Sequence, residues 1–408
     1  MKEGYIRCAA WAPFIESLAR SCQVYAPCEE GETVVFRRMG EGNPICLDRP
    51  DMVGAQRPLH GQKPAEPPPS SSDTGVSVCL DRPDMVGAQR PLHGQKPAEP
   101  PPSSSDTGVS VCLDRPAHGA PKGVIFPQSE TLFTFAFSKD PDEPQKTRVS
   151  LDAERPQRDA VILAARPCDA RGFTILDRVF LEADPYYKER RERTTIITLA
   201  CSRSFAGCFC NSVGGGPADK TGSDALVTEI EHGYYIEVLT EKGARTFADS
   251  SMENGAPYRD EAKKQQDGVT NGVGVCTDVR PDLSASDEFW QEASEKCLAC
   301  GACTYLCPTC HCFNITDEQG TTAGERIRSW DSCMFSHFTL EASGHNPRSG
   351  KSQRLKNRVE HKFVWYPEVH GEPACTGCGR CIRHCPASVD ISRIVTLLSS
   401  REEIDGAA

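Results

Sequence analysis

The sequence lacks any run of about eighteen apolar residues, the length that a membrane-spanning helix needs. Its first residues, MKEGYIRCAAWAPFIESLAR, carry charged groups where a secretory signal peptide has an unbroken apolar stretch. Both absences predict a cytoplasmic protein without a membrane partner. Aromatic residues make up only 7% of the chain and the formal net charge is −11, which argues against nucleic acid as a partner.

Nucleotide-binding signatures are also missing. The glycine-rich stretch GVTNGVGV at 268–275 follows no predicted strand and does not match the dinucleotide-binding pattern, and the glycines at 214–216 come without a Walker lysine. The sequence shows no flavin or haem site of its own either. We therefore expect any two-electron chemistry to lie on another subunit.

Cysteine, by contrast, is abundant, with 22 residues in 408. Eight of these cysteines form two runs of the pattern Cys-x2-Cys-x2-Cys-x3-Cys-Pro, a spacing at which a short loop places three thiolates around one iron–sulfur cube. Zinc sites usually use separated cysteine pairs, and disulfides impose no repeated spacing, so the runs predict two 4Fe–4S clusters. The first run is Cys297, Cys300, Cys303 and Cys307, and the second is Cys375, Cys378, Cys381 and Cys385.

The fourth cysteine of each run points away from its own cube and, in two-cluster ferredoxins, ligates the other cluster. One expected ligand set is therefore Cys297, Cys300, Cys303 and Cys385. The other is Cys375, Cys378, Cys381 and Cys307.

The interval between the runs, 308–374, is longer than a compact ferredoxin needs, and its pattern at 324–340 is compatible with a helix. It predicts an α-helical ferredoxin-like dicluster domain at 286–408. We interpret Cys310, Cys312 and Cys333 in this interval as buried or hydrogen-bonded thiols. A basic stretch at 348–362 predicts a solvated face, with an acidic partner or compensation of cluster charge as alternatives.

Upstream, strand and helix patterns alternate, which predicts an α/β (α+β) domain. The expected helices are 10–20 and 170–180, and the expected strands are 23–26, 33–36, 160–164 and 195–199, with apolar, β-prone residues at 123–126 and 131–137 and a hairpin at 225–230 and 234–239. This domain spans 1–45 and 122–251, and a polar linker at 252–285 joins it to the cluster domain.

A tandem repeat interrupts the α/β domain. Residues 46–78 recur without change at 79–111, and a third copy begins at 112. Each copy holds a PPPSSSD tract and almost no apolar periodicity, so it cannot bury enough surface to offset the entropy of ordering. We therefore predict a disordered, proline-rich insertion at 46–121, which is either a recent duplication or an artefact of sequence assembly.

Four more cysteines follow the two central strands of the α/β domain. Cys168 comes after the first strand, and Cys201, Cys208 and Cys210 come after the second. If these strands are parallel neighbours, both loops emerge at the same edge of the sheet, where ligand sites gather. The four thiols then form either a third iron–sulfur cluster or a group of buried or redox-active thiols.

Several strings resemble a known family. EKCLACGACTYLCPTCHCFNITDE, WDSCMFSHFTLEASGHNPR, CTGCGRCIRHCP, RPCDARGF and YYKERRERTTIITLACSRSFAGCFC are similar to the iron–sulfur beta subunit of cytoplasmic sulfhydrogenase-type nickel–iron hydrogenases, and equally to the A subunit of anaerobic sulfite reductase. The resemblance covers nearly everything outside the repeat. It implies an electron-transfer subunit between a flavin- and NAD(P)-binding partner and a catalytic hydrogenase or reductase subunit.

Two other functions stay open from the residues alone. The chain itself could reduce a small sulfur or disulfide substrate at Cys168, Cys201, Cys208 and Cys210. Alternatively, the clusters could act only as structural staples of a subunit interface.

Overall fold

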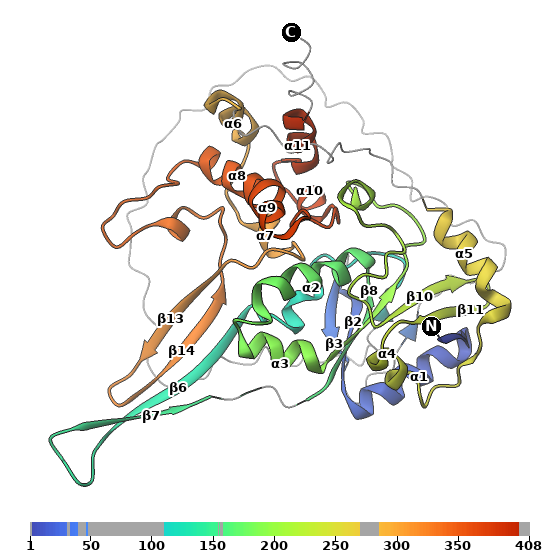
Figure 1. Ribbon diagram of the computed structural model, residues 1–408, viewed down its shortest axis with the longest axis horizontal. Helices are drawn as coiled ribbons and strands as arrows, with labels where there is room; N and C mark the ends of the chain where they lie inside the picture. The colour runs from blue at the N-terminus through green and yellow to red at the C-terminus, as the bar shows by residue number, and fades with distance from the viewer. Residues whose placement is uncertain are drawn as a thin grey trace, which may run out of the picture. The chain divides into compact units, whose positions relative to one another are not determined.

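The computed structural model describes residues 2–30, 33–39, 46–47, 110–153, 155, 158–269 and 285–399 (Figure 1). One structural unit comprises residues 1–48 and 108–408, and residues 49–107 are assigned to a second unit that lies outside the described residues. Most of the repeat that we predict to be disordered lies outside the described residues. Within the described residues no helix combines the length and the apolar character that crossing a membrane would require.

A ten-stranded mixed sheet organises the first part of the chain, in the order β12-β1-β11-β10-β9-β8-β2-β5-β4, with β3 paired to β2. Strands β2, β8, β9 and β10 run parallel to their neighbours within this group, as the alternating pattern predicted. The bounds are β1 Lys2–Arg7, β2 Gln23–Glu30, β3 Thr33–Arg38, β4 Cys46–Leu47, β5 Ser110–Val111, β8 Ala160–Ala165, β9 Thr194–Leu199, β10 Ala225–Ile230, β11 Gly233–Val238 and β12 Glu253–Asn254.

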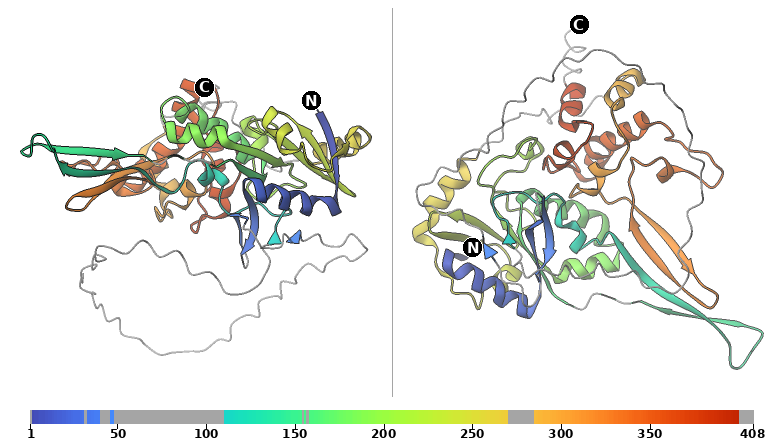
Figure 2. Two further views of the ribbon diagram at one scale, coloured as in Figure 1. Left: turned by 90° about the horizontal axis from the view of Figure 1, so that it is seen from below. Right: turned by 180° about the vertical axis from the view of Figure 1, so that it is seen from behind.

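Helices cover both faces of this sheet because side chains along a strand alternate between its faces. Val161 and Leu163 of β8 pack with α1 (Cys8–Ser21), whereas Ile162 packs with α2 (Pro167–Phe180). Figure 2 shows α1 and α2 on opposite sides of the sheet. The predicted helices at 10–20 and 170–180, the predicted strands at 23–26, 33–36, 160–164 and 195–199, and the hairpin β10–β11 are confirmed.

The other elements of this part are shorter. They are the helices α3 Pro185–Arg193, α4 Glu241–Thr246 and α5 Arg259–Asp267, and the 3-10 helices η1 Pro121–Val124, η2 Cys210–Val213 and η3 Ala256–Tyr258. The β-prone prediction for 123–126 is therefore wrong, because a proline opens a 3-10 turn there.

Two predicted boundaries differ from the structure. Residues 110–121, which we placed in the insertion, are folded: the amide of Cys112 donates to the carbonyl of Pro27 at 2.8 Å, and the amide of His118 donates to Val34. Part of the predicted linker is folded too, since β12 pairs with β1 and α5 contacts β10. Both segments are polar and lack periodicity, so their contacts with distant strands are invisible in the local sequence.

A second, four-stranded sheet has the order β13-β14-β6-β7. Its strands are β6 Ser129–Lys139, β7 Thr147–Asp152, β13 Phe313–Gln319 and β14 Ala323–Trp330. The helix predicted at 324–340 is wrong, because β14 is a strand held between β13 and the distant β6. Arg328 of β14 is buried and forms ion pairs with Glu130 and Asp184, both from before the cluster domain.

The cluster region is therefore not wholly helical, although helices surround its two cysteine loops. They pack into one apolar cluster that includes Trp290, Leu355 and Ile394. The elements are α6 Asp287–Ser294, α7 Ala302–Tyr305, η4 Ser336–Thr339, α8 Lys351–Glu360, the π-helix η5 His361–Trp365, α9 Tyr366–His370, α10 Arg380–Arg383 and α11 Ile391–Ser399.

Candidate iron–sulfur centres

The first cysteine loop lines a small cavity together with the end of the second run. The loop turns tightly, with Ala299 and Gly301 in the left-handed region at φ of 52° and 76°. A side chain at Gly301 would approach the ring of Phe335 to 2.7 Å, so glycine is needed there. Apolar side chains, among them Met334 and Leu355, complete the wall. The four thiols lining this cavity from the predicted set are Cys297, Cys300, Cys303 and Cys385.

This first centre reaches the surface of the unit. Cys300 is exposed, and the neighbouring Leu298 has 67% of its surface exposed. Cys381, which we assigned to the other set, also lines the cavity, so the two centres are close neighbours.

The second centre is buried. Its loop contains Gly377 and Gly379, both with positive φ, and Cys375 and Cys378 are buried beside them. Burial raises the pKa of Cys375 to about 11. Burial also raises the pKa values of Cys378 and Cys381, and repulsion from Cys307 raises all three pKa values further. Cys307 thus lies within electrostatic range of each member of its predicted set.

Cys307 itself is favoured as a thiolate, the form that binds iron. A hydrogen bond from Cys310 holds the pKa of the Cys307 thiol well below its usual range, against the effect of burial, and the charges of Lys362 and Arg358 act in the same direction. Similarly, a hydrogen bond from Cys333 lowers the pKa of Cys312. The interpretation of Cys310, Cys312 and Cys333 as hydrogen-bonded thiols agrees with these contacts.

The prediction of a solvated face is wrong for part of the basic stretch, whereas Lys351 in the same stretch is exposed. Arg354, Arg358 and Lys362 follow one another at intervals of four, so they share one face of α8 and η5, and all three are buried. That face is turned toward the cysteine loops: Arg358 donates to the Cys310 sulfur at 3.1 Å, and the Lys362 ammonium lies 3.6 Å from the Cys307 sulfur. The sequence contained a signal for this, because apolar Leu355 and Val359 flank the three cations at helical spacing.

The upstream cysteines lie beside the second centre. Because β8 and β9 are parallel, the loops carrying Cys168 and Cys201 leave the same edge of the sheet. Burial raises the pKa of Cys168, as do the charges of Asp169, Cys378 and Cys201. Cys208 donates to the carbonyl of Cys378 at 3.5 Å.

Backbone contact fixes this arrangement. The amide of Phe209 donates to the carbonyl of Gly377 at 2.8 Å, and a side chain at Gly377 would meet the backbone of Phe209 at 2.5 Å. Cys210 opens η2 immediately after Phe209. The fold therefore brings Cys168, Cys201 and Cys208 near one another and near Cys378, and the backbone of Cys210 lies against Gly377, next to Cys378 in the chain. Ligation of iron by the four stays a prediction.

No three Cys, His, Asp or Glu side chains in the described ranges converge closely enough to share a single metal ion. This holds for the two ferredoxin runs as well. A four-iron cube attaches each thiolate to a different iron, so its ligands surround a volume rather than one point.

A buried ion pair ties the second cysteine loop to the α/β sheet, and sequence reasoning missed it. Arg380, the first residue of α10, forms a two-pronged pair with Asp169 in the first turn of α2, with one N–O distance of 3.0 Å. Both side chains are at most 1% exposed. The Arg380 Nε also donates to the carbonyl of Ala117 at 3.0 Å. The positions of Cys168 and Cys378 are therefore coupled through their chain neighbours.

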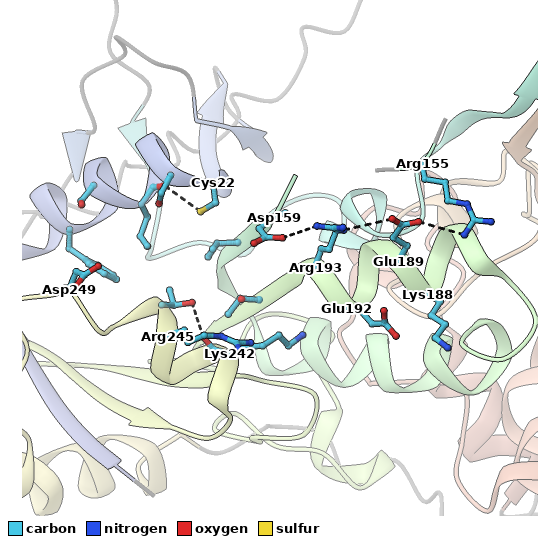
Figure 3. Close-up of a pocket in the computed structure, with 18 of the residues that line it drawn as sticks. Cys22, Arg155, Asp159, Lys188, Glu189, Glu192, Arg193, Lys242, Arg245 and Asp249 are labelled. Carbon is cyan, nitrogen blue, oxygen red and sulfur yellow. Dashed lines mark hydrogen bonds and ion pairs between the residues drawn. The ribbon is translucent and has the colours of Figure 1, made fainter. Parts of the chain in front are cut away.

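A wide cavity of about 1120 Å³ lies away from the cysteine loops and has Cys22 in its lining (Figure 3). Ala160 and Thr195 line it at the amino ends of β8 and β9, whereas the cysteines follow the carboxyl ends. Four of its charged side chains pair with one another: Arg193 pairs with Asp159 and Glu189, and Arg155 also pairs with Glu189. We therefore place the chemistry at the cysteine loops and not in this cavity.

Comparison with known proteins identifies relatives of the chain. The family model of a 4Fe–4S dicluster domain matches residues 296–389, which include both cysteine runs. Sulfhydrogenase 2 subunit beta of Pyrococcus furiosus is 31% identical over 249 residues, which are 58% of this chain and 72% of that protein. No solved structure matches the chain. The prediction of two 4Fe–4S clusters at the carboxyl-terminal side is confirmed.

Proposed function

The chain belongs to the family of the sulfhydrogenase beta subunit, and from that membership we propose that it relays single electrons between two other subunits. One partner binds flavin and NAD(P), and the other is a catalytic hydrogenase or a sulfite- or sulfur-reducing subunit. The observation that carries the proposal is that Cys385 of the second run lines the cavity of the first loop. Contact between the other two halves supports it, because Thr309, hydrogen-bonded to Cys307, donates to the carbonyl of Ala374 beside Cys375. Cross-ligation would keep two one-electron centres close together.

The residues of the chain have separate tasks in this relay. A 4Fe–4S cluster gains and loses one electron at a time. The thiolates of each set would hold one cube, and apolar neighbours such as Met334 and Leu355 would keep water from the inner side of the first. The exposed side at Leu298 and Cys300 is where we expect a partner to exchange electrons, while the buried second centre passes them inward. We propose a cytoplasmic location for the complex.

Reductive titration tests the relay directly on the isolated chain after anaerobic reconstitution. We expect both clusters to be reduced and reoxidised reversibly at low potential, each by one electron. Clusters with a purely structural role would resist reduction, or they would decompose when they are reduced. That result would reject the relay.

We further propose that Cys168, Cys201, Cys208 and Cys210 hold a third 4Fe–4S cluster beside the second. The contact between Cys208 and the Cys378 carbonyl supports this site, as does the burial of Cys168 and Cys201. Reconstituted protein should then contain about twelve iron atoms per chain rather than about eight.

Iron content of Cys201→Ser tests the third site. The variant should lose about four iron atoms, because one thiolate ligand is missing. Cys22→Ser is a matched control, since Cys22 lies at the amino ends of the strands and borders the wide cavity. Unchanged iron in Cys201→Ser would reject the third cluster and leave the interpretation of these cysteines as buried thiols.

A further inference from the structure

Three buried cations, Lys122, Arg358 and Lys362, lie against the cysteine loops without a carboxylate partner in the described part of the chain, and Lys122 donates to the carbonyls of Thr304 and Cys310. Arg358 and Lys362 are each 4% exposed, and neither forms an ion pair with Asp or Glu within the described part of the chain. A buried charge is costly unless another charge or several hydrogen bonds compensate it. Arg354, one turn earlier, is different because carbonyl oxygens of Met334, Arg348 and Ser349 surround its guanidinium.

The contacts of Lys362 all belong to the second centre. Its ammonium is 3.6 Å from the Cys307 sulfur, and it donates to the Thr309 hydroxyl at 2.7 Å and to the Ala374 carbonyl at 2.8 Å. Thr309 follows Cys307 by two residues, and Ala374 directly precedes Cys375. The two residues therefore adjoin the two halves of that ligand set. Lys362 thus connects both halves and faces the charge of the cluster that they would hold.

Arg358 lies between the two centres. It donates to the Cys310 sulfur at 3.1 Å and to the carbonyl of Cys303 at 2.8 Å. The corresponding cation near the first loop is Lys351, which donates to the Glu295 carbonyl from an exposed position, where water screens its charge. Arg358 therefore contacts both centres, whereas the contacts of Lys362 belong to the second centre alone.

We propose that Lys362 raises the reduction potential of the second cluster, because its buried positive charge stabilises the reduced state. The ligands of that cluster would be Cys307, Cys375, Cys378 and Cys381. Reduction adds one negative charge to a cube that already carries thiolates, and burial alone disfavours that addition. A cation at this distance in a region of low dielectric offsets the penalty much more strongly than an exposed one. An electron in the relay therefore resides preferentially on the second cluster. This inference depends on the proposed relay.

The test is a potentiometric titration of reconstituted full-length protein, monitored by electron paramagnetic resonance. We use the Cys297→Ser background so that the second cluster is observed without the first, and the Cys375→Ser background for the reverse. In the first background, Lys362→Met should lower the midpoint potential by 59 mV or more, a tenfold shift of the one-electron equilibrium. In the second background it should leave the potential of the first cluster within the error of the titration.

Two further variants separate charge from structure. Lys356→Met removes one positive charge from the neighbouring helix α8, but the Lys356 side chain is 32% exposed and pairs with Glu360 at 3.8 Å, so no shift is expected. Lys362→Arg keeps the charge and should restore most of the potential. If Lys362→Met fails to bind the second cluster, Lys362→Gln, which keeps a hydrogen-bond donor, is titrated in its place.

The possible failures are distinguishable. If the midpoint potential of the second cluster is unchanged in the variant that lacks the Lys362 charge, or if the potentials of both clusters shift equally, the inference is wrong. Neither result contradicts the proposed relay. Irreversible reduction of the unsubstituted protein overturns the relay itself.

Discussion

Cys385→Ser is expected to abolish the cluster of the first run, and Cys307→Ser the cluster of the second. Each variant should lose about four iron atoms per chain. The expectation follows from the cavity that Cys385 shares with Cys297, Cys300 and Cys303, and from the position of Cys307 among the thiols of the other loop. The measurement is iron and acid-labile sulfide content after anaerobic reconstitution.

Double variants reveal which cluster was lost. The double variant Cys385→Ser with Cys300→Ser should lose no more iron per chain than either single variant, because both substitutions remove a ligand of the same cluster. Combining Cys385→Ser with Cys378→Ser should remove about eight iron atoms. If the double variant Cys385→Ser with Cys378→Ser instead loses no more iron than either single variant, each run binds its own cube and the ligands do not cross.

Arg380→Met is expected to destabilise the cluster-loaded protein by about 3–5 kcal/mol, because it leaves the Asp169 carboxylate buried without its partner. This pair is at most 1% exposed on both sides and joins the second cysteine loop to α2. The substitution also removes the hydrogen bond from Arg380 to the carbonyl of Ala117, whereas Asp169 keeps its hydrogen bond from the Arg166 amide at 3.2 Å. The measurement is anaerobic unfolding in guanidinium chloride, followed by far-ultraviolet circular dichroism and cluster absorbance.

An exposed arginine provides the control. Arg326 pairs with Asp317 in the second sheet, where both side chains are more than 40% exposed. Arg326→Met should destabilise the protein far less than Arg380→Met, because water screens the exposed pair. Equal losses for the two variants would contradict the role that we assign to the buried pair. Adding Asp169→Leu to Arg380→Met should recover part of the loss, since no unpaired charge then remains.

The cysteine runs could be predicted from the sequence because their chemistry depends on local spacing. Three thiols separated by two residues each lie in one loop wherever that loop is placed. The two central strands could also be predicted, since Ala160–Ala165 is apolar along its whole length, which is typical of a strand covered on both faces, and Thr194–Leu199 is rich in β-branched residues. Their parallel pairing then placed the loops of Cys168 and Cys201 at one edge.

Features that depend on distant partners could not be predicted. The residues of β14 suit a helix locally, but they pair with β6, which lies almost two hundred residues earlier. Arg358 and Lys362 belong to a basic stretch whose default location is the surface, and only the fold turns them toward the thiols. The partner of Arg380 is likewise more than two hundred residues away, in the first turn of α2.

The relay is tested most directly by asking whether the chain performs any two-electron chemistry alone. Reconstituted protein, reduced under anaerobic conditions, is mixed separately with NADP⁺, sulfite and polysulfide, without any other subunit. We predict that the clusters stay reduced and that no NADPH or sulfide forms, because a one-electron relay needs a two-electron centre on a partner. Catalytic formation of sulfide by the chain alone would contradict the relay and favour direct reduction at the upstream cysteines.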